Sequence, residues 1–247
     1  EFVYFSQINH QLGTKEAIEA HRRNMPYTMG SLYWQMNDCW PTMSWATVDY
    51  YGNWKAAHYQ AKRSFENILI AEEFNKEDFR VYIVSDKLED LKGQLQLQWY
   101  SSKGNKIGES TVVDALINKN TSSLVYKGLT WPEKDKFLHV KLNVDGKFIS
   151  DKIISSQLPK NIKTELPEIE CSILEIDGKQ LLNISTNKPT WYLHLEYKDT
   201  DIKFEDNYFH LAPGMEKKVG IISSGTEGFD IKKLRIESLN YNSLDYH

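Results

Sequence analysis

The sequence predicts a mixed fold, in which a short α/β segment precedes two all-β sandwich domains. Composition changes along the chain, since residues 1–66 hold four of the seven Trp, four of the five Met and 13 of the 31 aromatic residues. These residues read as helix, strand, long loop and helix. The residues after them alternate apolar and polar side chains in short runs separated by turn signals, which is typical of antiparallel sheets. We therefore place the end of the α/β segment near residues 67–75.

The α/β segment is expected to begin with a helix over residues 14–24, with Thr14 as its N-cap and Pro26 as its stop. Residues 30–35 read as a short buried strand. Asn53 is the expected N-cap of a second helix. Its apolar face carries residues at three- to four-residue spacing: Trp54, Ala57, Ala61, Phe65 and Ile68. One strand cannot form a sheet, so this segment is expected to belong to a larger α/β domain.

The first sandwich is predicted from two alternating runs. Leu95, Leu97 and Trp99 alternate with glutamines, and a second run alternates with polar residues at Leu138, Val140, Leu142 and Val144. Asp145-Gly146 is a two-residue turn that favours a hairpin with residues 147–154. Half-buried antiparallel strands are the structure that this pattern indicates.

The second sandwich follows a predicted linker at residues 157–168, which contains two prolines and few apolar residues. Asp177-Gly178 is a second hairpin turn. Strands are expected at 180–186, 191–196 and 231–239, with a turn at 206–214. The expected domains are therefore 1–68, 69–158 and 159–247.

Composition excludes several classes of protein. The net charge is −4, so the chain carries no basic field for nucleic acid, and no apolar run approaches the roughly 18 residues of a membrane helix. Cys39 and Cys171 match no metal spacing or redox pair and are read as buried thiols, which excludes a disulfide scaffold. The seven histidines show no ligand spacing and are read as ordinary surface or helix residues. The first residue is not Met, so we expect the chain to begin inside a longer polypeptide or after processing.

Residues 36–51 form a polar loop rich in aromatic residues, and this loop contains most of the candidate binding residues. Tryptophans lie at the end of the predicted strand, and Asn37, Asp38 and Asp49 follow in the loop. This combination suits a sugar site, because the apolar C–H face of a pyranose stacks on indole while its hydroxyls need fixed amides and carboxylates. The alternative is that these tryptophans fill a core between domains.

The run Trp34-Gln-Met-Asn-Asp-Cys-Trp-Pro41, with Asp49-Tyr-Tyr-Gly-Asn-Trp-Lys-Ala56, resembles the last barrel strand and following helix of β-mannosidases in glycoside hydrolase family 2. Exo-β-glucosaminidases of that family share a Tyr-Trp strand end and a Trp-Pro but lack the Asn-Asp-Cys-Trp run. The family places two sandwiches after its barrel and ends with a segment similar to residues 206–214. The resemblance therefore covers the whole chain, strongly over residues 27–66 and loosely elsewhere.

The resemblance implies that residues 1–68 are the last helix, strand and helix of a (β/α)8 TIM barrel, and that the sandwiches are immunoglobulin-like. Because barrel sites lie at the carboxyl ends of strands, the expected substrate-binding residues are Trp34, Asn37, Asp38 and Trp40. In the family, the tryptophan corresponding to Trp34 lies beneath the sugar being cleaved, and its peptide bond to the next residue is commonly cis. Asn37 and Asp38 have an alternative role, which is to orient Trp34 or to bridge the loop to the barrel.

The implied activity is that of an exo-acting retaining β-mannosidase, which removes terminal nonreducing β-D-mannose from oligosaccharides or glycans. Its two catalytic glutamates would lie upstream, so we expect no catalytic residue in this chain and no activity of the chain alone. A self-contained pair of Asp38 and Asp49 is rejected, because the family uses glutamates. No metal or redox cofactor is implied.

Two other functions remain open: an exo-β-D-glucosaminidase of the same family, and a non-catalytic carbohydrate-binding or structural module. An exposed coplanar pair among Trp99, Trp131 and Trp191 would favour a binding module, and burial of all three would favour spacer domains. The expected partner is a β-mannoside oligosaccharide, with neither nucleic acid nor a membrane. A homodimer is one option for the oligomeric state, and the family suggests a periplasmic or secreted location.

Overall fold

A computed structural model describes residues 1–75, 78–129, 131, 135–197, 202–223 and 229–242. The chain forms two compact units. One contains Glu1–Gln98, Glu109–Glu133 and His139–Ser156, and the other contains Trp99–Gly108, Lys134–Leu138 and Gln157–His247. The first unit thus combines the helical segment with most of the first sandwich. The three domains expected from the sequence stay a prediction.

Helix α1 (Phe2–Arg23) is twice as long as predicted, and the predicted start at Thr14 is wrong. Gly13 lies inside the helix, and the Thr14 hydroxyl donates to the His10 carbonyl at 2.9 Å instead of capping a helix end. The helix begins earlier because its buried face does: Tyr4 and Ile8 continue the spacing of the buried residues Gln11, Ile18, Glu19 and Arg22.

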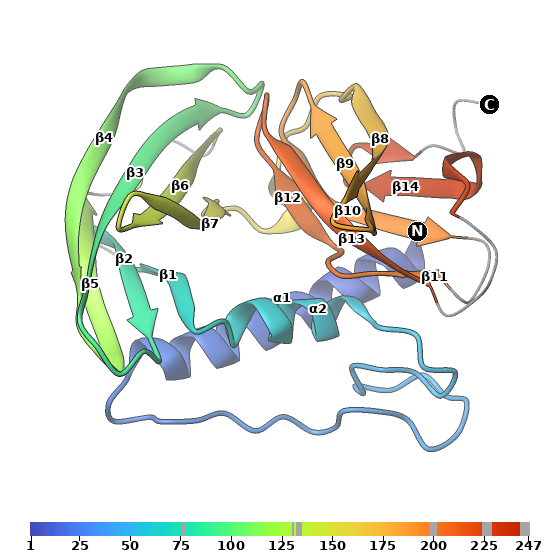
Figure 1. Cartoon of the computed structure of the whole chain (residues 1–247), viewed down its shortest axis with the longest axis horizontal. Helices are drawn as coiled ribbons and strands as arrows, with labels where there is room; N and C mark the ends of the chain where they lie inside the picture. The colour runs from blue at the N-terminus through green and yellow to red at the C-terminus, as the bar shows by residue number, and fades with distance from the viewer. Residues whose placement is uncertain (76–77, 130, 132–134, 198–201, 224–228, 243–247) are drawn as a thin grey trace. The chain divides into compact units, whose positions relative to one another are not determined.

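Helix α2 (Ala56–Ser64) packs along α1 (Figure 1). The predicted Asn53 cap is wrong, because the backbone and side-chain nitrogens of Asn53 donate to the Asp49 carboxylate at 2.8 and 2.9 Å. The amide of Ala56 instead donates to Oε1 of Gln7 on α1, at 2.9 Å. Of the predicted apolar face, Ala57 and Ala61 are buried and Trp54 is half-buried, whereas Phe65 is exposed and Ile68 opens the first strand.

The buried strand predicted at residues 30–35 is wrong. These residues contain no strand, and Leu32, Tyr33 and Trp34 are exposed. A strand needs a hydrogen-bonded neighbour, and the four sheets found within the described residues are all built from strands after residue 67.

The first sandwich has one sheet in the order β1-β2-β5 and one in the order β4-β3-β6-β7 (Figure 1). Its strands are β1 (Ile68–Phe74), β2 (Asp78–Ser85), β3 (Leu91–Ser101), β4 (Lys106–Ile117), β5 (Thr121–Leu129), β6 (Lys136–Val144) and β7 (Lys147–Ile154). Strands β1 and β2 pair antiparallel, with Ile68 opposite Ser85 and Ile70 opposite Ile83.

The alternation predicted for the first sandwich is confirmed. Leu95, Leu97, Leu138, Val140, Leu142 and Val144 are buried, and Trp99 is half-buried. Both residues of the Asp145-Gly146 turn have positive φ, at 50° and 74°, as the predicted two-residue hairpin requires. The surface assignment of the histidines is wrong for His139, which is buried with its Nε2 2.6 Å from Oδ2 of Asp151. His247 lies outside the described residues.

The second sandwich has the sheets β11-β13-β9-β8 and β12-β10-β14-β15. Its strands are β8 (Ile169–Ile176), β9 (Lys179–Thr186), β10 (Thr190–Tyr197), β11 (Ile202–Phe204), β12 (Phe209–Leu211), β13 (Glu216–Ser223), β14 (Leu234–Ser238) and β15 (Tyr241–Asn242). The Asp177-Gly178 turn has φ values of 51° and 72°, which confirms this hairpin as well. Leu182, Ile184, Leu193 and Phe204 belong to its core.

Two predictions for the second sandwich need correction, and the prediction of a linker before it is confirmed. The predicted turn at 206–214 contains strand β12, and the predicted strand at 231–239 opens with the 3-10 helix η2 (Ile231–Lys233). The linker at 157–168 is confirmed as irregular chain, apart from the 3-10 helix η1 (Pro159–Asn161).

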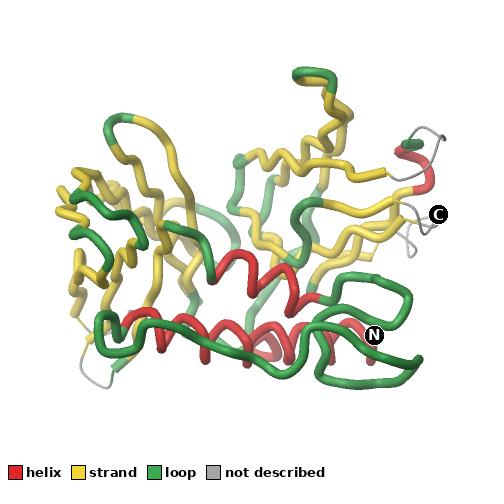
Figure 2. Tube along the Cα trace, turned by 60° about the horizontal axis from the view of Figure 1, so that its bottom comes forward, coloured by secondary structure: helices red, strands yellow, loops and turns green. Residues whose placement is uncertain are grey.

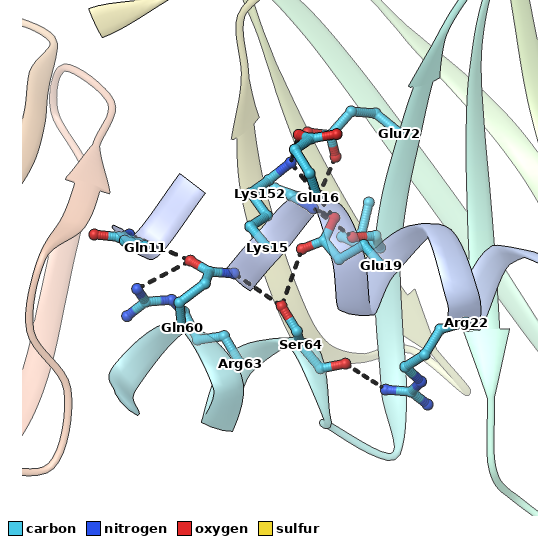
Figure 3. Close-up of polar contacts among 11 residues, drawn as sticks. Gln11, Lys15, Glu16, Glu19, Arg22, Gln60, Arg63, Ser64, Glu72 and Lys152 are labelled. Atoms are coloured by element: carbon cyan, nitrogen blue, oxygen red, sulfur yellow. Dashed lines mark hydrogen bonds and ion pairs between the residues drawn. The ribbon is translucent and has the colours of Figure 1, made fainter. Parts of the chain in front are cut away.

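Buried ion pairs attach α1 to the first sandwich (Figure 3). The ammonium of Lys152, on β7, lies 2.7 Å from carboxylate oxygens of both Glu19 and Glu72. The ammonium of Lys15 lies 2.6 Å from Glu72 and 3.6 Å from Glu19. We call these four residues the buried charge cluster. Because they come from α1, β1 and β7, the cluster fixes the helical segment on the sandwich.

The cluster also reaches α2. The Ser64 hydroxyl lies 3.4 Å from Oε1 of Glu19 and accepts from Nε2 of Gln60 at 2.9 Å. Arg22 donates to the Ser64 carbonyl at 2.8 Å and pairs with Asp86 at 2.7 Å. Helix α1 therefore holds both ends of α2, through Gln7 at its start and Arg22 at its end.

Candidate functional site

The candidate site lies on residues 30–55, which belong to the connection from α1 to α2 in the sequence. This connection folds back on itself (Figure 2). Three backbone hydrogen bonds join the two limbs of this segment: Thr47 to Gln35 at 3.2 Å, Val48 to Met36 at 2.8 Å, and Asp38 to Val48 at 3.1 Å. The Lys55 amide then donates to the Thr47 carbonyl at 2.9 Å, just before α2 begins. The segment is therefore ordered by specific contacts although it forms no sheet.

Trp34 is 77% exposed and Trp40 is 66% exposed. The peptide bond between Trp34 and Gln35 is cis, which confirms the expectation drawn from the resemblance. Neither indole is buried among the described residues of this chain, and the alternative that they fill a core against the rest of a barrel stays open. An exposed indole face is available for stacking on a sugar.

Asp38 is buried beneath this surface. Its Oδ1 accepts from the Ser44 hydroxyl at 2.5 Å, and its Oδ2 lies 3.2 Å from the Lys55 ammonium. The hydrogen bond from Ser44 holds the pKa of the Asp38 carboxyl below its usual value, and Lys55 adds to this effect against the opposing effect of desolvation. Asp38 is therefore an anionic anchor with both oxygens engaged by the protein.

Asn37 is exposed, and its Nδ2 lies 3.3 Å from the Asp38 carbonyl. Of the four predicted binding residues, Trp34, Asn37 and Trp40 are thus exposed, while Asp38 faces inward. A direct contact of any of them with sugar stays a prediction.

Nothing in the sequence predicts that Ser44 is a partner of Asp38. Lys55 was expected only as part of the motif that ends at Ala56. These two residues are 6 and 17 positions from Asp38 and follow no periodic pattern. The segment also exposes many large apolar side chains besides the two tryptophans. They are Leu32, Tyr33, Met36, Met43, Trp45, Tyr50 and Tyr51.

The cysteines differ from the prediction. Cys39, between Asp38 and Trp40, is exposed, so its assignment as a buried thiol is wrong. Cys171 is half-buried, and burial raises the pKa of its thiol to about 12. Across the ranges that the structure describes, no three His, Cys, Asp or Glu side chains converge as a metal site would need. No helix in those ranges is both long and apolar enough to cross a bilayer.

The tryptophans of the sandwiches do not form a sugar platform in the described residues. Trp191 is buried, and Trp131 packs edge-on between Phe74 and Phe79 with centroids 5.0 Å from each. Trp99 is half-buried. The exposed coplanar pair that would favour a binding module is therefore not found among them.

Two family models match the β portion of the chain. A Mannosidase Ig/CBM-like domain matches residues 77–161, and the Ig-fold domain of mannosidases matches residues 164–242. A helical segment followed by these two domains defines the class of protein as the C-terminal portion of a multidomain glycosidase.

The chain is similar in sequence and in fold to known β-mannosidases. The chain is 28% identical over 251 residues to β-mannosidase A of Neosartorya fischeri, covering 91% of the chain and 27% of the relative. It is 28% identical over 257 residues to β-mannosidase A of Aspergillus flavus, covering 94% and 28%. The crystal structure of β-D-mannosidase from Dictyoglomus thermophilum superposes with a TM-score of 0.84 at 27% identity, over 96% of this chain and 29% of that one. These matches support a similarity to the C-terminal portion of β-mannosidases over nearly the whole chain.

A further structure shares the fold alone. The exo-chitosanase of Amycolatopsis orientalis superposes with a TM-score of 0.73 at 16% identity, over 97% of this chain and 34% of that one. The chain spans less than a third of the length of the mannosidases that it matches.

Proposed function

We propose that this chain is part of an exo-acting retaining β-mannosidase that hydrolyses terminal nonreducing β-D-mannose from oligosaccharides or glycans. The observation that carries the proposal is the exposed Trp34 at the start of a loop ordered by specific hydrogen bonds. The β-mannosidases among the relatives support the choice of sugar.

In the proposed site, Trp34 supports the apolar face of the mannose ring, because C–H groups of a pyranose stack on indole. Asn37 offers an amide to a hydroxyl, since its side chain is exposed and close to Trp34 in sequence. Trp40 supplies a second apolar surface. Asp38 keeps these residues in place, because its carboxylate oxygens already bind Ser44 and Lys55.

A retaining reaction needs two carboxyl groups about 5–5.5 Å apart, one as nucleophile and one as acid and base. The acidic residues of the candidate segment do not suit these roles, because Asp38 is engaged by Ser44 and Lys55 and Asp49 by Asn53. We therefore propose that both catalytic glutamates lie on chain upstream of residue 1. In this proposal, residues 1–68 are the end of the barrel, and 69–158 and 159–247 are accessory sandwiches.

The test is hydrolysis of a panel of 4-nitrophenyl glycosides by the intact enzyme and by this chain. We expect the intact enzyme to cleave the β-mannoside selectively and this chain to cleave none. Preference for the β-glucosaminide would favour the exo-β-D-glucosaminidase alternative. Turnover by this chain alone would contradict the proposed place of the carboxylates.

A further inference from the structure

We propose that Thr47 is a positioning residue, which fixes the backbone directly after Trp34 and thereby the place of the Trp34 indole in the sugar site. The inference rests on the proposed function, in which Trp34 supports the mannose ring. It adds to that site a residue that does not touch the sugar and that acts through the chain carrying Trp34.

Thr47 binds the two residues that follow Trp34. Its amide donates to the Gln35 carbonyl at 3.2 Å, and its hydroxyl donates to the Met36 carbonyl at 3.0 Å. The Met36 carbonyl also accepts from the Val48 amide at 2.8 Å, so both of its lone pairs are used. Two successive carbonyl groups, beginning one residue after Trp34, are therefore held by Thr47 and its neighbour.

Helix α2 holds Thr47 in turn. The Lys55 amide donates to the Thr47 carbonyl at 2.9 Å, and Nδ1 of His58 on α2 lies 3.2 Å from the Thr47 hydroxyl oxygen. Because the hydroxyl gives its one hydrogen to the Met36 carbonyl, the contact with His58 is a hydrogen bond when Nδ1 carries hydrogen. Burial lowers the pKa of His58, so its ring is neutral near pH 7. Every polar atom of Thr47 is therefore used.

The contacts of Thr47 are shielded from water by this chain itself. Thr47 is 1% exposed and Ala46, which precedes it, is 0% exposed, so this burial does not depend on the chain before residue 1. A buried polar group that loses its partner is costly, and the buried hydroxyl therefore favours one conformation of the backbone at residues 35 and 36. Valine has nearly the shape of threonine but no hydroxyl, so Thr47→Val keeps the packing and removes the contact.

This arrangement matters to Trp34 because a side chain is placed no better than the backbone that carries it. A group that binds substrate needs to be held within about 0.5 Å of its productive place, which takes supporting contacts from rigid elements behind it. Thr47 supplies such contacts from α2 to the residues next to Trp34. Since Thr47 is buried and its polar atoms are engaged, it acts through Trp34 rather than on the sugar.

The first experiment measures hydrogen–deuterium exchange of the intact enzyme. We expect Thr47→Val to speed exchange in residues 35–48 several-fold, and Thr47→Ser, which keeps the hydroxyl, to leave it as in the wild type. Thr190→Val is the matched control, because Thr190 is 0% exposed and its hydroxyl donates to the Lys188 carbonyl at 3.1 Å, on β10 of the second sandwich. Unchanged exchange in Thr47→Val, or an equal rise in Thr190→Val, would overturn the proposal.

The second experiment measures kcat and KM of the intact enzyme for 4-nitrophenyl β-mannoside. We expect Thr47→Val to lower kcat/KM by roughly 10- to 100-fold, because a misplacement of about 1 Å in a group that positions the substrate can cost about 100-fold. KM should rise, since Trp34 contacts the bound mannose in the proposed function. Thr47→Ser and Thr190→Val should stay within about twofold of the wild type, which is the scale of a substitution that leaves the site in place.

A role of Thr47 in stability alone would reduce the amount of folded enzyme, which lowers the apparent kcat and leaves KM unchanged. That result, or faster exchange with wild-type kinetics, would overturn the positioning role. If Thr47→Val does not fold, His58→Ala removes the α2 partner of the hydroxyl instead. We expect it to change exchange and KM in the same direction by a smaller factor, and wild-type values of both would overturn the proposal.

The two experiments separate this inference from the proposed function. If the wild-type enzyme does not cleave the β-mannoside, the proposed function fails, and the role of Thr47 in a sugar site fails with it. The exchange experiment then still decides whether Thr47 holds residues 35–48.

Discussion

The buried charge cluster and the group formed by Asp38, Ser44 and Lys55, which we call the lock, use the same chemistry in two different regions of the chain. Both pair lysine with a buried carboxylate, but the cluster joins α1 to strands of the first sandwich, whereas the lock closes the base of an exposed loop. Around the cluster the side chains are packed, and around the lock large aromatic side chains are exposed. Buried charge therefore fixes the scaffold in one region and closes the base of an exposed loop in the other.

The largest expected effect comes from breaking the cluster. Lys152→Met leaves Glu19 and Glu72 with only Lys15 as a cation, and an uncompensated buried charge costs about 3–5 kcal/mol. We expect a loss of this size in the free energy of unfolding, measured by urea denaturation. Lys163→Met is the control, because its pair with Asp135 is exposed and such pairs are worth about 0–1 kcal/mol. Equal effects of the two substitutions would show that the cluster does not fix the scaffold.

The first sandwich is packed and the site segment is exposed, and this difference is tested by replacing one leucine in each of them. Leu142 is fully buried on β6, so Leu142→Ala should cost about 2–5 kcal/mol. Leu32 is fully exposed in the site segment, so Leu32→Ala should change stability by no more than about 0.5 kcal/mol. Urea denaturation of this chain measures both. A large loss for Leu32→Ala would mean that the site segment is part of a core.

The stability that the buried charge cluster contributes should depend on pH. Burial alone would raise the pKa of Glu72, but Lys15 and Lys152 outweigh burial and hold that pKa far below its usual value. Burial alone would lower the pKa of Lys15, but Glu72 and Glu19 outweigh it and raise that pKa above its usual value. The contribution of Glu72 to the free energy of unfolding is therefore present above its unfolded pKa of about 4.3 and is lost in acid. The contribution of Lys15 to the free energy of unfolding is present below its unfolded pKa of about 10.4 and is lost in alkali.

We expect the stability difference between the wild type and Glu72→Gln to be constant between about pH 6 and pH 9 and to shrink as the pH falls below about 4. Urea denaturation across this range measures the difference. A difference that grows in acid would contradict the direction of the Glu72 shift.

The contacts of Asp38 with Ser44 are expected to contribute less to stability than the buried core does. Ser44→Ala removes a contact at the base of a loop whose residues 39–43 are all exposed, so the thermal midpoint should change less than in Leu142→Ala. Differential scanning fluorimetry measures both. A larger shift for Ser44→Ala would make the lock part of the scaffold.

Short stretches of sequence predicted the sandwiches, because each hairpin is formed by residues that are close together in the chain. Asp145-Gly146 and Asp177-Gly178 specify positive φ at two successive residues, and the alternating leucines near them specify the buried face. The predicted start of α1 is wrong because Thr14 was taken as an N-cap, although the buried face continues back to Tyr4. Propensity at one residue was outweighed by packing of the whole helix face.

The candidate site was predicted less completely, because its contacts join residues with no periodic spacing. Trp34, Asn37 and Trp40 were recognised from residue type and motif, and the structure leaves them exposed. The partners of Asp38 were not predicted, since nothing in the sequence pairs Ser44 and Lys55 with it. The cluster was missed for the same reason: Glu19 reads as an ordinary helix carboxylate until β7 brings Lys152 to it.

The most direct test of the central claim, that residues 34–45 form part of a mannose site while the sandwiches support it, is hydrogen–deuterium exchange of the intact enzyme with and without a mannose-configured inhibitor. We expect the inhibitor to slow exchange in residues 34–45 and to leave residues 159–242 unchanged. Protection confined to the strands of the sandwiches would contradict the account and would identify them as the sugar-binding part of the chain.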